Sequence, residues 1–126
     1  MRAVGYQTPL PVEAPNALVD IDLPRPAPRG RDLLVEIRAV SVNPVDTKVR
    51  TGVSPAENEW KVLGWDAAGI VIEAGPDASL FKPGDEVFYA GALTRPGSNA
   101  EFQLVDERIV GPKPKTIGWA EAAALP

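Results

Sequence analysis

The sequence offers few residue types for acid–base, nucleophilic or metal chemistry. Its 126 residues include 17 carboxylates and 13 lysines or arginines, but no cysteine and no histidine. The only phenols are Tyr6 and Tyr89. This composition excludes disulfides, thiol nucleophiles, a Ser-His-Asp arrangement and a zinc site built from imidazole or thiolate. A hard-metal site made only of carboxylates is conceivable, although the spacing of an EF-hand loop is missing.

Charge and hydropathy exclude two classes of partner. The formal net charge of −4 gives no basic footprint for a nucleic acid. The longest apolar runs are far shorter than the roughly 20 residues needed to cross a bilayer. Met1–Leu10 shows no basic segment followed by an apolar run, so no secretory signal is visible. We therefore expect a cytoplasmic protein that binds neither nucleic acid nor membrane.

The prolines limit which secondary-structure elements can position the polar residues. The chain has 14 prolines and 11 glycines, spread along its length. Because an interior proline breaks a helix, this spacing favours short strands joined by turns, as in β-sandwiches and small barrels. Pro24–Arg31 is predicted to be a turn or edge loop. The predicted strand segments are Met1–Tyr6, Val19–Leu23, Leu33–Val42, Ala67–Glu73, Phe81–Tyr89 (a turn and a strand), Glu101–Val105 and Arg108–Val110.

Two segments carry helical signals. Asn43–Asp46 has an N-cap residue, a proline at the first helical position and an acid at the third, and Gly52 can end this helix. Thr116–Leu125 is alanine-rich, and its first residue is a candidate cap. Pro126 follows directly, and we interpret this as a domain whose continuation is missing.

Four segments stand out together: Leu33–Arg50, Leu63–Gly75, Phe81–Tyr89 and Arg95–Lys113. In this order, they resemble the N-terminal catalytic domain of the medium-chain dehydrogenase/reductase superfamily. The similarity is to its quinone oxidoreductase and zinc-type alcohol dehydrogenase-like branch. It implies a mainly β, GroES-like, partly open barrel with one or two short helices over residues 1–126. No G-x-G-x-x-G fingerprint occurs, so the resemblance implies that NADP(H) binds mainly to a Rossmann domain outside this chain.

Two positions depart from the zinc-dependent pattern of this superfamily. Asn43 stands where zinc alcohol dehydrogenases present a cysteine ligand, and Gly64-Trp65-Asp66 replaces their Gly-His-Glu block. The lobe with four structural cysteines is absent as well. The resemblance therefore implies a zinc-free enzyme. In zinc-free relatives, hydride passes from NADPH to an electron-poor enone or quinone that needs mainly positioning beside the nicotinamide.

The resemblance also implies roles for three residues near the first helix. Asn43 and Asp46 are candidate cofactor-binding residues near the nicotinamide ribose, with helix capping as the alternative role for Asn43 and a favoured first-turn acid as that for Asp46. Lys48 is a candidate catalytic residue, with a solvated surface lysine as the alternative. If Asn43 caps the helix, Asn43→Asp should preserve the melting temperature and impair turnover.

Three aromatic residues are further candidates. Trp60 and Trp65 could form the walls of a pocket for a planar substrate, although buried packing is the more common fate of tryptophan. Tyr89 ends a predicted strand and could donate a proton, with a structural role as the alternative.

These observations predict the substrate domain of a zinc-independent, NADP(H)-dependent oxidoreductase that reduces quinones, enones or related carbonyl compounds by hydride transfer. Alone, this chain is expected to be inactive. Two alternatives are a non-catalytic GroES-like binding or assembly module and a zinc-dependent alcohol dehydrogenase, which the missing ligands disfavour. Expected partners are a small-molecule substrate and, in the full-length protein, a second copy in a homodimer. A Rossmann glycine motif after Pro126 would favour the enzyme over the module.

Overall fold

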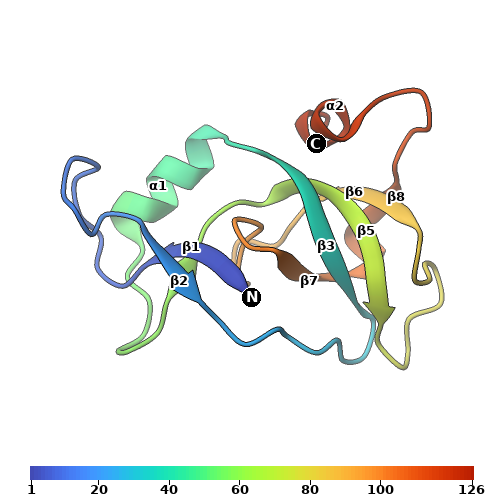
Figure 1. Ribbon diagram of the computed structural model, residues 1–126, viewed down its shortest axis with the longest axis horizontal. Coiled ribbons are helices and arrows are strands. Elements are labelled where there is room, and N and C mark those ends of the chain that lie inside the picture. Colours follow the sequence, from blue (N-terminus) through green and yellow to red (C-terminus); the bar gives the residue numbers. More distant parts are fainter.

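The computed structural model describes residues 1–126, which form two antiparallel sheets and two short helices (Figure 1). The smaller sheet has the strand order β2-β1-β4, with β1 at Arg2–Tyr6, β2 at Val19–Asp22 and β4 at Lys61–Val62. The larger sheet has the order β7-β3-β5-β6-β8. Its strands are β3 (Asp32–Ser41), β5 (Asp66–Ala74), β6 (Glu86–Ala90), β7 (Phe102–Asp106) and β8 (Val110–Pro112).

A short backbone segment joins the two sheets. On one side, the amide of Val4 in β1 donates to the carbonyl of Asn99 at 2.9 Å, and Ala3 forms an isolated bridge with Ala100. On the other side, the amide of Ile37 in β3 donates to the carbonyl of Glu101 at 2.9 Å. The result is a partly open barrel, which confirms the predicted mainly β fold class.

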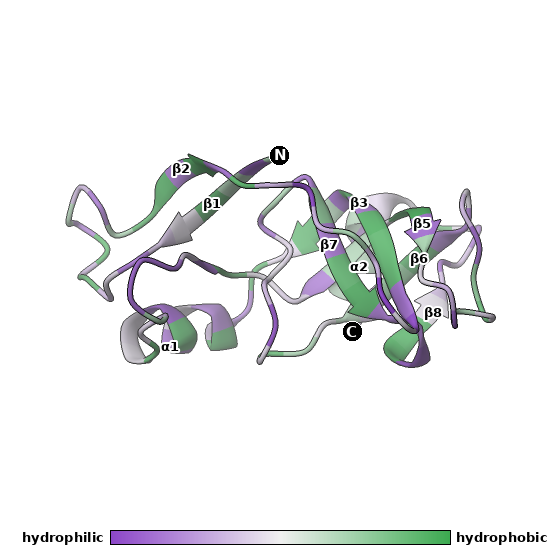
Figure 2. Cartoon of the chain, turned by 90° about the horizontal axis from the view of Figure 1, so that it is seen from below, coloured by the Kyte–Doolittle hydropathy of each residue, from purple (hydrophilic) through white to green (hydrophobic).

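The main core lies against the larger sheet. Figure 2 shows hydrophobic residues along much of β3 and β7. Because side chains alternate across a strand, one face of each strand supplies the core. Each fully buried valine or leucine side chain in it contributes roughly 1.5–3 kcal/mol to the stability of the fold. Gly69 is required where β5 passes β3, because a Cβ there would collide with the carbonyl oxygen of Glu36. The core residues are Leu33, Val35, Ala67, Val71, Val87, Tyr89 and Val105.

Helix α1 (Pro44–Gly52) follows β3 after two residues, as the sequence predicts. Helix α2 (Trp119–Ala124) packs its buried alanines, Ala122 and Ala123, against Ala68 of β5. It begins with Gly118 as its N-cap, so the predicted start at Thr116 is wrong. Neither helix has the length and hydropathy of a membrane span.

The reason for the later start of α2 lies in the loop before it. The ammonium group of Lys113 donates to the carbonyls of Pro114 and Ile117 at 3.1 and 2.7 Å. A helix that started at Thr116 would include the Ile117 carbonyl, which Lys113 instead holds in the loop.

Two further differences from the sequence prediction concern short elements. The two-residue strand β4 was not predicted, because two residues are too few to show an alternating pattern. Arg108 lies in the 3₁₀ helix η1 (Glu107–Ile109) and not in a strand. The carboxylate of Asp106 accepts from the Arg108 amide at 2.9 Å and so caps this turn.

Candidate functional site

The register of the larger sheet brings two polar side chains together at the junction between β3 and α1. Ser41, the last residue of β3, lies opposite Asp66, the first residue of β5. Asn43 follows two residues later, and its amide Nδ2 donates to Oδ2 of Asp66 at 2.8 Å and to the carbonyl of Ser41 at 3.3 Å. Both side chains are half-buried. Residues 23 positions apart in the sequence therefore form one polar site.

The start of α1 adds a second carboxylate to this site. Asn43 is the N-cap, as predicted, and forms a capping box with Asp46. The Asp46 carboxylate, only 6% exposed, accepts from the backbone amide of Asn43 at 2.8 Å. The carboxamide oxygen of Asn43 faces the Asp46 amide but makes no capping hydrogen bond. Asn43 therefore takes the predicted N-cap position, while the Nδ2 end of its carboxamide bonds to Asp66.

Asp66 is the member of this site that sequence reasoning missed. The sequence did contain a signal that could have pointed to Asp66, because it is the acidic residue of the Gly64-Trp65-Asp66 block. What the sequence pattern lacked was the pairing of the first residue of β5 with the last residue of β3, which places Asp66 beside Asn43.

Lys48 lies on α1 with its side chain exposed. Its ammonium group takes part in none of the hydrogen bonds or ion pairs of the chain, whereas Arg50 on the same helix donates to the carbonyl of Leu10 at 2.7 Å. Lys48 is therefore free to meet a ligand or solvent.

The two tryptophans do not share a pocket. Trp65 is 3% exposed and packs with Tyr6 and Leu63 beneath α1. Its indole Nε1 is buried without a hydrogen-bond partner. Trp60 is 37% exposed and lines a separate hollow beside Val19 of β2. The predicted shared wall of a substrate pocket is therefore not formed within this chain.

Tyr89 belongs to the core of the larger sheet. It is 2% exposed, and its hydroxyl donates to Oε1 of Gln103 at 2.7 Å. Burial raises the pKa of the Tyr89 phenol well above its usual value of 10.0. A buried phenol that holds its proton so strongly and already has an acceptor is poorly placed to protonate a substrate, and this argues against the predicted catalytic role.

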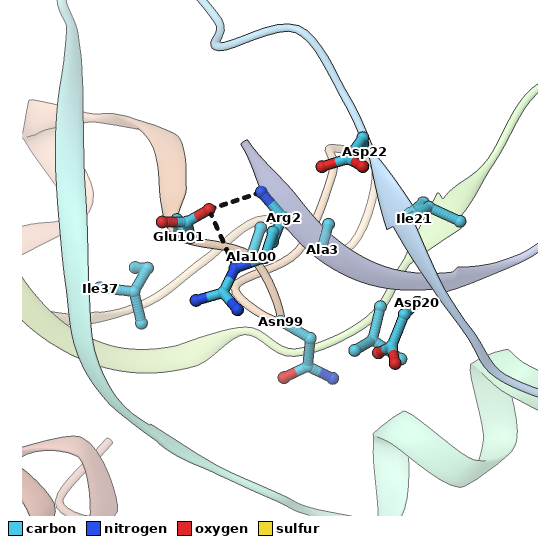
Figure 3. A pocket seen from close by; sticks show the side chains of 10 residues that line it. Arg2, Ala3, Asp20, Ile21, Asp22, Ile37, Asn99, Ala100 and Glu101 are labelled. Carbon is cyan, nitrogen blue, oxygen red and sulfur yellow. Dashed lines mark hydrogen bonds and ion pairs between the residues drawn. The ribbon is translucent and has the colours of Figure 1, made fainter.

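A hollow of about 600 Å³ lies elsewhere, between β1, β2 and β3 (Figure 3). Its wall includes the pair formed by Arg2 and Glu101, in which the Arg2 backbone amide donates to the Glu101 carboxylate at 2.6 Å. The hollow shares no residue with the polar site around Asn43. The candidate site is thus defined by its hydrogen bonds and not by this hollow.

The residues at this site do not fit a zinc ion of the kind held by imidazole or thiolate, because the chain has neither group. No group of three or more Asp and Glu side chains is arranged to hold a metal ion either. The site is therefore a hydrogen-bonding site built from one carboxamide and two carboxylates.

Comparison with known proteins identifies the family. Residues 29–115 match the alcohol dehydrogenase GroES-like domain, and the chain belongs to this family. It is 46% identical over 127 residues to a zinc-type alcohol dehydrogenase-like protein of Staphylococcus aureus, covering 100% of this chain and 37% of that protein. It is 42% identical over 102 residues to the 2-methylene-furan-3-one reductase of Solanum lycopersicum, covering 75% of this chain and 26% of the reductase. The chain thus spans just over a third of the length of the curated Staphylococcus relatives.

Solved structures support the same assignment. A candidate zinc-dependent alcohol dehydrogenase from Rhizobium etli CFN 42 matches with 66% identity and a TM-score of 0.96, over 100% of this chain and 36% of that one. The Escherichia coli quinone oxidoreductase, crystallised with NADPH, matches with 27% identity and a TM-score of 0.84, over 99% of this chain and 37% of that one. The chain therefore resembles the N-terminal domain of oxidoreductases of the alcohol dehydrogenase and quinone oxidoreductase family.

Proposed function

We propose that this chain is the substrate-side domain of a zinc-independent, NADP(H)-dependent oxidoreductase. Its substrates are quinones, enones or related carbonyl compounds, and its dinucleotide is held mainly by a Rossmann domain outside residues 1–126. The observation that carries the proposal is the site at the start of α1, where Asn43, Asp46 and Asp66 form a hydrogen-bonded group without any zinc ligand. The relatives that act on an enone and a quinone support the substrate class.

The residues present fit a dinucleotide better than they fit a metal. Nδ2 of Asn43 is engaged by Asp66 and Ser41, whereas its carboxamide oxygen faces the Asp46 amide without a capping hydrogen bond and retains acceptor capacity. A ribose hydroxyl is a donor that could use this oxygen. Asn43 and Asp46 would therefore line the cofactor side of the site. When bound, the reduced nicotinamide supplies a hydride to the electron-poor carbon, and a proton from solvent completes the two-electron reduction.

This chain contributes orientation and not acid–base chemistry. Asp66 orients Asn43, and Asp46 fixes the start of α1. Lys48, which is exposed on α1, is the cation available to face a substrate oxygen. Because quinones and enones accept hydride without strong activation, positioning accounts for most of the rate in this proposal. As expected from the sequence, we propose as well that the full-length protein is cytoplasmic and forms a homodimer.

The test is turnover by the full-length protein that contains this chain. We expect oxidation of NADPH, followed by its absorbance, with 1,4-benzoquinone and with 2-cyclohexenone. Treatment with a strong zinc chelator should leave both rates unchanged. Alcohol oxidation that the chelator abolishes would instead identify a zinc-dependent alcohol dehydrogenase. No turnover of any of these substrates would favour a binding or assembly module.

A further inference from the structure

The hydrogen bonds of Asn43 commit the nitrogen end of its carboxamide, while the oxygen end faces the Asp46 amide without a capping hydrogen bond. An asparagine side chain has two N–H donors on Nδ2 and one acceptor oxygen. Here Nδ2 is directed to two oxygens, Oδ2 of Asp66 at 2.8 Å and the carbonyl of Ser41 at 3.3 Å. The carbonyl of Ser41 and an ionised carboxylate are both acceptors only, so they fix the nitrogen and oxygen positions of the amide without ambiguity.

The bond to Asp66 is the stronger of the two. It is shorter by half an ångström than the bond to Ser41, and its acceptor is ionised, which roughly doubles the strength of a hydrogen bond. No ion pair neutralises Asp66, whereas five of the other carboxylates, such as Asp32 and Asp85, have cationic partners within 3.1 Å. The Asp66 carboxylate is therefore free to accept the hydrogen bond from Nδ2 of Asn43.

We infer that Asp66 is a positioning residue that makes Asn43 an acceptor-only group toward any bound molecule. The inference rests on the proposed function in taking that molecule to be a nicotinamide dinucleotide. Asn43 then selects for a donor, such as a hydroxyl of the nicotinamide ribose. Without the Asp66 charge, the amide could turn and present an N–H instead, and the selection would be lost.

The first test examines the positioning itself in the full 126-residue chain. In the ¹H–¹⁵N spectrum of the wild type, the side-chain amide signals of Asn43 should differ from those of the exposed Asn16. In Asp66→Leu they should move to the positions of an exposed asparagine. Asp20→Asn, a change at an exposed aspartate of β2, is the matched control and should not move them.

If Asp66→Leu does not fold, Asp66→Asn replaces it in this test and should produce a smaller shift in the same direction. Asn43 signals that stay in place in the folded variant would overturn the positioning role, whatever the protein does as an enzyme.

The second test examines selection in the full-length protein by calorimetric titration. NADPH is compared with an analogue whose nicotinamide ribose lacks its hydroxyls. The wild type should bind the analogue roughly tenfold more weakly, because a tenfold change in Kd corresponds to the free energy of one good hydrogen bond. In Asp66→Asn this difference should shrink to about twofold, while Asp20→Asn should keep the full difference.

The two tests fail in distinguishable ways. An equal penalty in the wild type and Asp66→Asn would overturn the selection by Asn43. Equal binding of NADPH and its analogue by the wild type would overturn the proposed cofactor role of Asn43, although the spectroscopic result would still report on the positioning by Asp66.

Discussion

At the scale of single residues, position 43 is sensitive to charge. The carboxamide of Asn43 donates to a carboxylate of β5, and a second carboxylate, that of Asp46, accepts from its backbone amide. The side chain of an asparagine can donate to Asp66 while its backbone amide donates to Asp46. An aspartate side chain at this position can only accept. The same position therefore couples the stability of the junction to the proposed cofactor contact.

Asn43→Asp is expected to destabilise the protein. The new carboxylate would lie at hydrogen-bond distance from Asp66, and like charges that close repel each other. We expect a loss of about 2 kcal/mol at pH 7, or roughly 8 °C in Tm, because the hydrogen bond is lost and a repulsion is added. This reverses the expectation from the sequence that the melting temperature would be preserved.

The measurement is thermal unfolding at pH 7. Asn43→Ala is the comparison, because it removes the hydrogen bond without adding charge and should cost only about 1 kcal/mol. An Asn43→Asp protein as stable as the wild type at pH 7 would contradict the contact with Asp66.

Tyr89→Phe separates a structural phenol from a catalytic one. Loss of the hydroxyl leaves Oε1 of the buried Gln103 without its donor, and an unsatisfied buried acceptor costs about 1–2 kcal/mol. We expect lower stability in urea unfolding and an unchanged kcat for quinone reduction by the full-length protein. A fall in kcat of tenfold or more would restore Tyr89 to the active site.

At the scale of elements, the buried carboxylate of Glu107 ties η1 to distant loops. It is 0% exposed and accepts from the amides of Ser79 and Leu80 and from the guanidinium of Arg31. Burial by itself would raise the pKa of Glu107, but the hydrogen bonds from Leu80, Ser79 and Arg31 outweigh it and hold the pKa below its usual value of 4.5. The charged form of Glu107 is therefore the stabilising one.

Glu107→Gln should remove a pH-dependent part of the stability. Because the pKa of Glu107 is lower in the folded state, its contribution is present above pH 4.5 and is lost as the pH falls through the folded-state pKa. In urea unfolding across this range, the wild type should lose stability on acidification more steeply than Glu107→Gln. Glu57→Gln, at an exposed position, should follow the wild type. Parallel curves for the wild type and Glu107→Gln would contradict the prediction.

The sequence predicts elements well where local signals are strong and poorly where distant contacts decide. Proline at the first helical position marked α1, and the alternation of Val19 and Ile21 with acids marked β2. The burial of Glu107 in η1 depends on contacts with residues such as Ser79, 28 positions away, and no local pattern reports such contacts. For the site, Asn43 and Asp46 could be read from the helix start, but their neighbour Asp66 required the strand register.

At the scale of the whole molecule, the lack of thiolate and imidazole groups limits the metal chemistry that the chain can support. No cysteine or histidine is available anywhere in the chain. We expect the purified protein to carry less than about one-tenth of a zinc ion per chain, because structural and catalytic zinc sites use these side chains. Metal analysis by mass spectrometry checks this expectation. About one zinc ion per chain would contradict it.

Cofactor binding should likewise depend on more than this chain. No G-x-G-x-x-G motif occurs in residues 1–126, so the groups that usually hold a pyrophosphate are missing. We expect no calorimetric signal when NADPH is titrated into the chain, and clear binding to the full-length protein. Micromolar binding to residues 1–126 would show that the chain holds the dinucleotide without a partner domain.

Helix α1 is held at both of its ends, and this affects how it moves. At its start, Asn43 bonds to Asp66 of β5; near its end, the hydroxyl of Tyr6 in β1 lies 3.0 and 2.7 Å from the carbonyls of Val49 and Val53. A helix of nine residues has little stability of its own in water. Its amide protons therefore become open to exchange only when the neighbouring strands also open, and α1 behaves dynamically as part of the barrel, not as a flap over it.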